Sequence, residues 1–162
     1  MTTIACSMKT HSMAADSMCN QGDVAFTVRK IVRLPEGAGL LGTAGSRYLT
    51  GFFEASFRGG VYDIQKPEAP EGEGDFEAVW LRPDGIWVFD CSFYSEIVGE
   101  VAAIGTGGKT AMSHMLDDLT PEEAVRRACR VDVNSREPVY VEFLENACAR
   151  NKSKSRTAPS RS

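Results

Sequence analysis

The first seventeen residues carry the pattern that most constrains the fold of this chain, because they predict an N-terminal hairpin. Residues 2–8 (TTIACSM) favour a strand, and a polar turn at residues 9–11 separates them from residues 12–17 (SMAADS). Two such runs joined by a short polar turn are typical of paired antiparallel strands. The hairpin places Thr2 at one strand end and Asp16 at the end of the neighbouring strand.

Beyond this hairpin, strand and helix patterns come in blocks. Further strands are expected at residues 24–34, 40–46, 77–81, 86–90, 101–104 and 139–141. Apolar residues at helical spacing predict helices over residues 48–57, 111–116 and 121–129. The last helix begins with Thr120-Pro121-Glu122-Glu123, which contains the residues of a capping box. Because strands and helices do not alternate regularly, the predicted class is α+β.

The composition is that of one ordinary folded domain. The chain has 162 residues, of which 43% are hydrophobic and 25% are charged. No apolar run approaches the ~20 residues needed to cross a bilayer, and no secretory signal is visible. Five cysteines without CxxC spacing indicate reduced thiols, and two histidines leave little for a zinc centre. We therefore expect a cytoplasmic protein without a membrane partner.

The last residues differ in composition from the rest. Residues 149–162 (ARNKSKSRTAPSRS) contain five basic residues and no acid, although the net charge of the chain is −4. This segment lacks hydrophobic periodicity, so we expect a domain over residues 1–148 and a disordered basic tail over residues 149–162. A solvated tail is favoured over a nucleic-acid contact for so short a segment.

Thr2 directly follows Met1, so removal of Met1 would expose a threonine with a free α-amine beside its own hydroxyl. That pair supplies a nucleophile and a base in one residue. The α-amine of a model peptide has a pKa near 7.7–8.0, so part of it is neutral and able to accept a proton around pH 7. Many chains begin Met-Thr without any catalytic role, so the remaining sequence must decide.

Six short segments occur in one order along residues 2–144. They are Thr2-Thr3-Ile4, Ala15-Asp16-Ser17, Arg29-Lys30-Ile31, Gly42-Thr43-Ala44-Gly45, Ala103-Ile104-Gly105-Thr106-Gly107-Gly108 and Asp132-Val133-Asn134-Ser135. In this order they resemble the catalytic core of the proteasome-type N-terminal threonine peptidases. Within that group, the bacterial HslV (ClpQ) type is the most similar.

The resemblance implies a four-layer αββα sandwich of the N-terminal-nucleophile hydrolase type. It implies that the Thr2 hydroxyl attacks the substrate carbonyl, that Lys30 lowers the pKa values of the Thr2 amine and hydroxyl, and that Asp16 orients Lys30. Gly45 would donate its N–H to the oxyanion. The residues implied to hold the Thr2 amine and the proton network are Thr106, Asp132 and Ser135. Peptide-bond chemistry requires no cofactor here, and a structural role for a monovalent or divalent cation stays open.

Each of these residues also has a structural interpretation. Lys30 lies between Arg29 and Arg33 and could be a solvated cation. Asp16 could be an ordinary turn residue, and Gly45 could be required only by the backbone conformation of its turn. Asp132 and Ser135 could simply cap a loop. The joint occurrence of all these residues in family order favours the catalytic interpretation.

One departure from the resembled family concerns its helices. The family has two helices after its glycine turn, whereas residues 65–75 (QKPEAPEGEGD) replace the second helix here. The resembled peptidases form closed homo-oligomeric rings, and the HslV type receives polypeptide substrates from a ring-shaped unfolding ATPase. The missing helix puts docking of such an ATPase in doubt.

The sequence therefore predicts a threonine endopeptidase that cleaves peptides or unfolded proteins inside a homo-oligomeric ring, with Thr2 exposed by removal of Met1. Two alternatives stay open. The chain could be an N-terminal-nucleophile amidase acting on a small substrate, or a ring-forming scaffold without catalytic activity.

Overall fold

The computed structural model describes residues 2–21, 24–68, 71–72 and 74–145. Its helices are α1 (Arg47–Arg58), α2 (Gly108–Leu116) and α3 (Pro121–Ala128), with a short 3-10 turn η1 at Pro35–Gly37. Its strands are β1 (Thr3–Ser7), β2 (Ser12–Ala15), β3 (Met18–Gln21), β4 (Val24–Thr27), β5 (Ile31–Arg33), β6 (Leu40–Gly45), β7 (Phe76–Arg82), β8 (Gly85–Phe89), β9 (Ser95–Val98), β10 (Val101–Gly105) and β11 (Tyr140–Phe143). The α+β class is confirmed.

The predicted N-terminal hairpin forms the centre of a four-stranded antiparallel sheet in the order β10-β1-β2-β11. Ile4 pairs with Ala15, and Thr3 pairs with Gly105 on the other side of β1. On the outer side of β2, Tyr140 of β11 also pairs with Ala15. This register places the start of β1, the end of β2 and the end of β10 side by side at the same end of the sheet.

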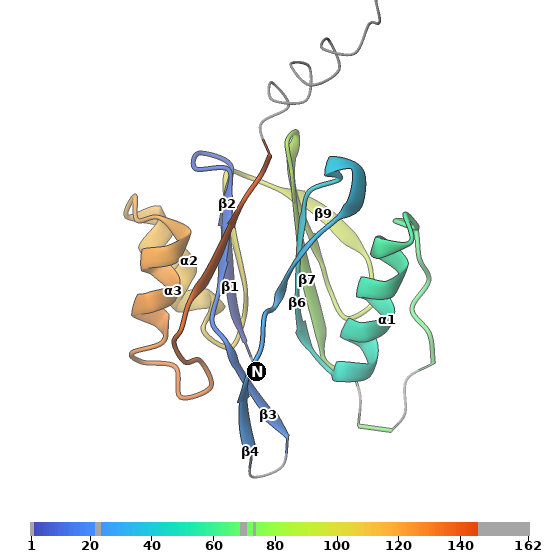
Figure 1. The fold of residues 1–162 in the computed structure, drawn as a ribbon, viewed down its shortest axis with the longest axis horizontal. Helices are drawn as coiled ribbons and strands as arrows, with labels where there is room; N and C mark the ends of the chain where they lie inside the picture. Colours follow the sequence, from blue (N-terminus) through green and yellow to red (C-terminus); the bar gives the residue numbers. More distant parts are fainter. Residues whose placement is uncertain (1, 22–23, 69–70, 73, 146–162) are drawn as a thin grey trace, which may run out of the picture.

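A second antiparallel sheet has the order β5-β6-β7-β8-β9. Its central hairpin joins β7 and β8 through a turn at Pro83-Asp84, with Arg82 opposite Gly85. Gly45 at the end of β6 pairs with Phe76 at the start of β7. A separate two-stranded ribbon, β3-β4, extends from the end of the first sheet (Figure 1).

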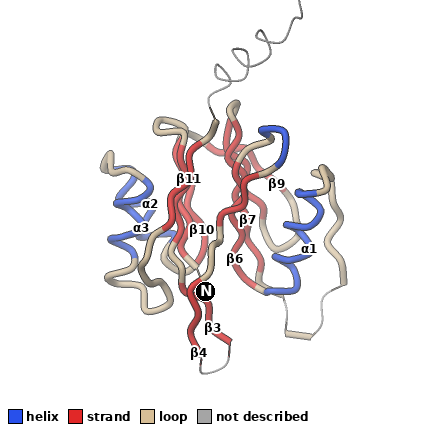
Figure 2. Tube along the Cα trace, viewed as in Figure 1, coloured by secondary structure: helices blue, strands red, loops and turns tan. Residues whose placement is uncertain are grey.

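The two sheets face each other, and the helices lie outside them. Helices α2 and α3 cover the outer face of the first sheet, and α1 lies against the outer face of the second (Figures 1 and 2). Buried side chains from both sheets fill the space between them, among them Ile4 and Met13 from the first and Leu40, Val79 and Ile86 from the second. This apolar layer fixes the sheets relative to each other.

Aromatic residues form the core between α1 and the second sheet. The predicted helical stripe places Phe53 and Phe57 fully inside this core. The Phe53 ring lies 4.9 Å from the ring of Phe76 and 5.0 Å from that of Phe93 (centroid distances). The stripe is therefore core packing.

Some boundaries differ from the expectations. The extended region predicted over residues 24–34 is divided into β4 and β5 by residues 28–30, because β4 pairs with β3 whereas β5 pairs with β6. Strands β3 and β9 were not predicted, and the last strand is Tyr140–Phe143 instead of residues 139–141. The capping box at Thr120 and Glu123 is present.

The connection between α1 and β7 contains no helix among its described residues, 59–68, 71–72 and 74–75. No described helix has the length and apolar character needed to cross a membrane. The predicted basic tail over residues 149–162 lies outside the described residues.

The aromatic core yields a stability prediction. Phe53→Ala should lower the free energy of unfolding by about 3–5 kcal/mol, because it removes a fully buried ring and leaves a cavity. Urea denaturation followed by fluorescence would measure the change. Phe52→Ala is the matched control, since Phe52 lies beside Phe53 in α1 but is 39% exposed. Equal losses in the two variants would contradict the assigned core.

Candidate active site

A buried ion pair lies beside the start of β1. The Lys30 Nζ atom donates a hydrogen bond to Asp16 Oδ1 at 2.8 Å, and the two side chains are 7% and 0% exposed. Asp16 follows the end of β2, and Lys30 immediately precedes β5. The alternative of a solvated Lys30 side chain is therefore wrong.

The Asp16 carboxylate also accepts three backbone hydrogen bonds. Its Oδ1 atom accepts from Thr3 N at 2.8 Å. Its Oδ2 atom accepts from Met18 N at 2.9 Å and from Arg136 N at 3.3 Å. A buried carboxylate is stable only when its charge and lone pairs are satisfied in this way. Asp16 therefore joins four separate segments of the chain at one point.

Two opposing effects act on the pKa of the Lys30 ammonium group. Burial lowers the pKa of Lys30 below its ordinary value, while the Asp16 carboxylate works in the opposite direction. The net direction is downward. A lysine with a lowered pKa releases a proton more readily than a solvated lysine and can take part in proton transfer.

A second network consists of hydroxyl groups around Asp132. Ser135 Oγ donates to Asp132 Oδ2 at 2.6 Å, and Thr106 Oγ1 donates to the same oxygen at 2.7 Å. The Thr3 hydroxyl lies 2.5 Å from Ser135 Oγ. Partial burial tends to raise the pKa of Asp132, but the hydrogen bonds from Ser135 and Thr106 hold it below its ordinary value. Asp132 thus stays ionised and orients both hydroxyls.

The turn after β10 lies directly against Thr2. A Cβ atom at Gly105, where φ is +86°, would lie only 2.0 Å from the Thr2 carbonyl oxygen. Only glycine permits both this backbone conformation and this approach. The next residue, Thr106, places its hydroxyl 3.5 Å from the same carbonyl oxygen. The shorter bond to Asp132 takes the Thr106 proton, so the Thr2 contact is the weaker one.

Gly45 lies at the corresponding end of the second sheet. Its φ is +111°, and a Cβ atom there would lie 2.3 Å from the Asp75 carbonyl oxygen, so a side chain is excluded. Glu77, one residue after the Gly45 partner Phe76, reaches across to the first sheet and accepts a hydrogen bond from Gly105 N at 2.7 Å. This contact joins the Gly45 end of the second sheet to the turn that borders Thr2.

The structure therefore gathers the predicted residues at one end of the two sheets. Asp16 and Lys30 are in direct contact, as are Thr106, Asp132 and Ser135, and both groups border Thr2 or Thr3. Gly45 is connected to them through β7 and Glu77. Sequence reasoning missed Thr3 and Glu77. Thr3 could have been noticed as a polar residue on an apolar strand, whereas nothing in the sequence singles out Glu77.

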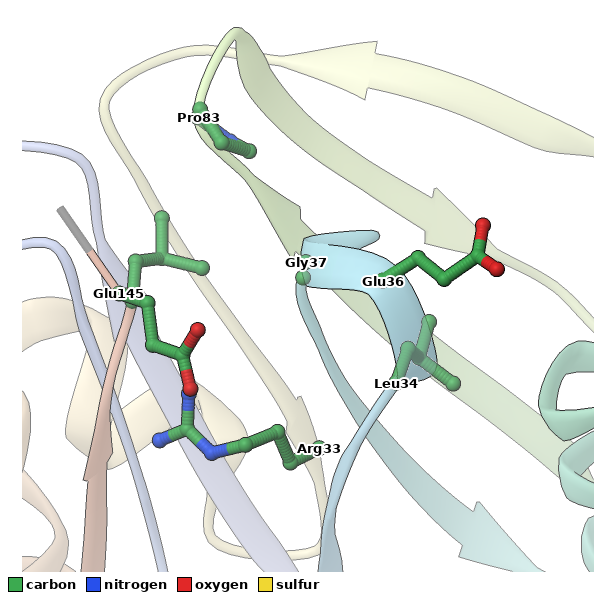
Figure 3. A pocket seen from close by; sticks show the side chains of 8 residues that line it. Arg33, Leu34, Glu36, Gly37, Pro83 and Glu145 are labelled. Atoms are coloured by element: carbon green, nitrogen blue, oxygen red, sulfur yellow. The ribbon is translucent and has the colours of Figure 1, made fainter. Parts of the chain in front are cut away.

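The structure has one cavity beside the Asp132 network and another at the opposite end of the sheets. One, of about 320 Å³, is lined by Cys129, Asp132 and Ser135 among others. Burial raises the pKa of the Cys129 thiol to about 11, so this thiol is protonated at neutral pH. The other cavity, of about 150 Å³, lies where η1 approaches the end of β11, and Figure 3 shows Arg33 directed toward Glu145 there. Among the described residues, no cluster of acidic, cysteine or histidine side chains could hold a metal ion.

The four bonds to Asp16 generate a prediction. Asp16→Asn should lower the free energy of unfolding by about 3–5 kcal/mol, because the amide NH₂ must face donors whichever way it is oriented and Lys30 loses its counterion. Chemical denaturation would measure the loss. Asp84→Asn is the control, since the Asp84 side chain is 59% exposed in a turn and should lose less than about 1 kcal/mol. A small effect of Asp16→Asn would show that the pair is not tightly held.

No protein-family model matches the sequence, and a search of curated proteins also finds no match. Solved structures do match. BPH from Thiobacillus denitrificans, in complex with epoxomicin, is 17% identical, with 89% of this chain and 100% of that chain covered and a TM-score of 0.63. HslV from Trypanosoma brucei is 19% identical, with 86% and 97% covered and a TM-score of 0.62.

Anbu (ancestral beta-subunit) from Yersinia bercovieri is also similar, with 13% identity, 87% of this chain and 80% of that chain covered and a TM-score of 0.65. The expected likeness to the HslV type is confirmed at the level of the fold. The chain therefore has the fold of the HslV, BPH and Anbu proteins, with a buried Asp16–Lys30 pair and a hydroxyl network at the start of β1.

Proposed function

We propose that this protein is a threonine endopeptidase of the N-terminal-nucleophile type, with Thr2 exposed by removal of Met1. The observation that carries the proposal is the convergence of two polar networks on Thr3, the residue next to the proposed nucleophile, at one end of an otherwise apolar sandwich. The arrangement of two facing sheets with helices outside both supports the four-layer αββα architecture of that class. The fold shared with HslV and BPH supports the same assignment.

In the proposed reaction, the Thr2 hydroxyl oxygen attacks the carbonyl carbon of the scissile amide. The hydroxyl proton passes to the neutral Thr2 α-amine, which acts as the general base. The tetrahedral intermediate collapses when its nitrogen receives that proton and leaves as an amine. The remaining acyl group forms an ester with Thr2, and a water molecule, activated by the same amine, hydrolyses the ester and restores the hydroxyl.

Lys30 and Asp16 tune this reaction electrostatically. The Lys30 ammonium favours deprotonated forms of the Thr2 amine and hydroxyl, since a nearby positive charge lowers their pKa values. Asp16 fixes the ammonium in place, and its bond to Thr3 N fixes the backbone next to the nucleophile. The same carboxylate thus positions both the cation and the start of β1.

Gly45 is the proposed donor to the oxyanion. Its left-handed backbone turns the chain at the end of β6, and no side chain covers its exposed surface. One backbone N–H directed at a developing oxyanion contributes on the order of 3 kcal/mol to transition-state stabilisation. Thr106, Asp132 and Ser135 would hold the α-amine so that its lone pair faces the Thr2 hydroxyl.

The remaining parts of the proposal concern assembly and substrate. We propose that the domain over residues 1–148 forms a homo-oligomeric ring in the cytoplasm, encloses its active sites and cleaves peptides or unfolded polypeptides, with residues 149–162 as a basic tail. The connection between α1 and β7 has no helix among its described residues, which removes one surface on which a ring-shaped unfolding ATPase could dock. No cofactor is required by this chemistry.

The nucleophile is tested by Thr2→Ala. Wild-type protein should lack Met1 by intact mass and hydrolyse small fluorogenic peptide amides, whereas Thr2→Ala should lose activity by more than about 10³-fold. Native mass spectrometry should show the same oligomer for both. Thr27→Ala, on the exposed strand β4, is the matched control and should keep wild-type activity.

The outcomes distinguish the alternatives. Persistent peptide hydrolysis by Thr2→Ala would overturn the proposal. Cleavage of small amides without cleavage of peptides would favour the amidase. An unprocessed, inactive protein that still forms a ring would favour the scaffold. Because BPH from Thiobacillus denitrificans was solved with epoxomicin, we also expect the wild type to bind this compound and Thr2→Ala to bind it more weakly.

The lowered pKa of Lys30 generates a pH prediction. The ratio kcat/KM should rise with pH as the Thr2 amine loses its proton and fall again as Lys30 is deprotonated, below the ordinary lysine pKa of 10.5. Lys30→Arg should reduce the ratio but abolish the alkaline fall, because arginine stays protonated up to about pH 12. Initial rates measured across the pH range test this, and an unchanged alkaline limb in Lys30→Arg would contradict it.

A further inference from the structure

We propose that Thr3 is a positioning residue, whose hydroxyl orients Ser135 so that one lone pair of Ser135 Oγ is directed at the Thr2 α-amine. This inference rests on the proposed function, because it assumes that the α-amine of Thr2 is the catalytic base. It assigns a role to a residue that does not itself contact the reacting carbonyl.

Thr3 occupies a distinctive place on β1. Its side chain is polar but completely buried. The next residue, Ile4, packs in the apolar core between the sheets, to which Thr3 does not belong. The Thr3 N–H donates to Asp16, and the Thr3 hydroxyl contacts Ser135. Thr3 is therefore the one described residue that bonds directly to both the Asp16–Lys30 pair and the Asp132 network.

The direction of the hydrogen bonds follows from proton counting. A serine hydroxyl has one proton and two lone pairs. Ser135 uses its proton for Asp132 Oδ2, 2.6 Å away, so the 2.5 Å contact with Thr3 requires the Thr3 hydroxyl to donate. The chain of donors then runs from Thr3 to Ser135 to Asp132. Thr3 occupies one lone pair of Ser135 Oγ, and the proposal assigns the other to the Thr2 amine.

The turn after β10 is shaped to admit this hydroxyl. A Cβ atom at Gly107 would lie 2.0 Å from Thr3 Oγ1 and 3.1 Å from Asp132 Oδ2. The absence of a side chain at residue 107 thus provides the space in which Thr3, Ser135 and Asp132 meet. Any larger residue there would displace the Thr3 hydroxyl from Ser135.

Removing the Thr3 hydroxyl should favour the protonated form of the amine. In Thr3→Val the Ser135 oxygen no longer accepts from Thr3 and accepts more strongly from the ammonium, and a hydrogen bond to the charged form raises the pKa of an amine. Less neutral base is then present at neutral pH. The other ionisable groups that surround this end of β1 are Asp16, Lys30, Glu77, Cys129, Arg130, Asp132, Arg136 and Glu137, and Thr3→Val replaces none of them.

The experiment titrates the Thr2 amine directly, in full-length protein prepared with Thr2 as the first residue. The rate of acetylation of the amine by acetic anhydride, followed by mass spectrometry of the N-terminal peptide, gives its pKa without any peptidase substrate. Thr3→Val should shift this titration upward and lower kcat/KM by about fivefold to tenfold at pH 7. Thr3→Ser, which keeps the hydroxyl, should restore both.

Two further variants keep the test decisive. Ser135→Ala should shift the titration downward instead, because the ammonium loses an acceptor, and adding Thr3→Val to it should cause no further shift. Ser7→Ala is the matched control, since Ser7 is a buried hydroxyl on β1 that bonds only to Lys9 N among the described side-chain contacts.

An unchanged amine titration in Thr3→Val, or equal shifts in Thr3→Val and Ser7→Ala, would overturn the positioning role. Because the titration needs no substrate, that result can be told apart from a failure of the proposed function, in which Thr2→Ala and wild type hydrolyse peptides equally.

Discussion

The buried Asp16 carboxylate is the point on which the rest of the active-site end depends. It accepts hydrogen bonds from Lys30, from Thr3 at the start of β1, from Met18 at the start of β3 and from Arg136 before β11. Burying a charge is costly unless its partners compensate, so these four segments are held to one geometry. The position of Thr3, next to the proposed nucleophile, relative to Lys30 is set by these bonds to one carboxylate oxygen.

The second network completes the site from the opposite side. Asp132 accepts hydrogen bonds from the hydroxyls of Thr106 and Ser135. The hydrogen bond from Gly105 N to Glu77 connects the second sheet to the turn beside Thr2. The core between the sheets is apolar, so the polar groups concentrate at the end of the sandwich. Fully satisfied polar networks of this kind are rigid, and rigidity is what a preorganised nucleophile and base require.

Much of this arrangement could be predicted from the sequence, because the signals are local. The hairpin, the aromatic helix and the capping box at Thr120 depend on residues close together in the chain. The family-like order of short segments pointed to Asp16, Lys30, Thr106, Asp132 and Ser135. Glu77 could not be predicted, since its bond to Gly105 spans two sheets and exists only once they pack. Strand β3 (MCNQ) was missed for a different reason: its pairing with β4 is local, but its sequence lacks the alternation of apolar and polar residues that predicts a strand.

The likeness to HslV, BPH and Anbu structures concerns the fold, and the geometry at Thr2 carries the chemical proposal. The proposed chemistry requires the Thr2 hydroxyl to form an ester with the acyl group of the substrate. The most direct measurement is tandem mass spectrometry of the N-terminal peptide after acid quenching during turnover of a peptide substrate. We expect the substrate's acyl group on Thr2, with Met1 absent. An acyl group on another residue, or retained Met1 in protein that is turning over substrate, would contradict it.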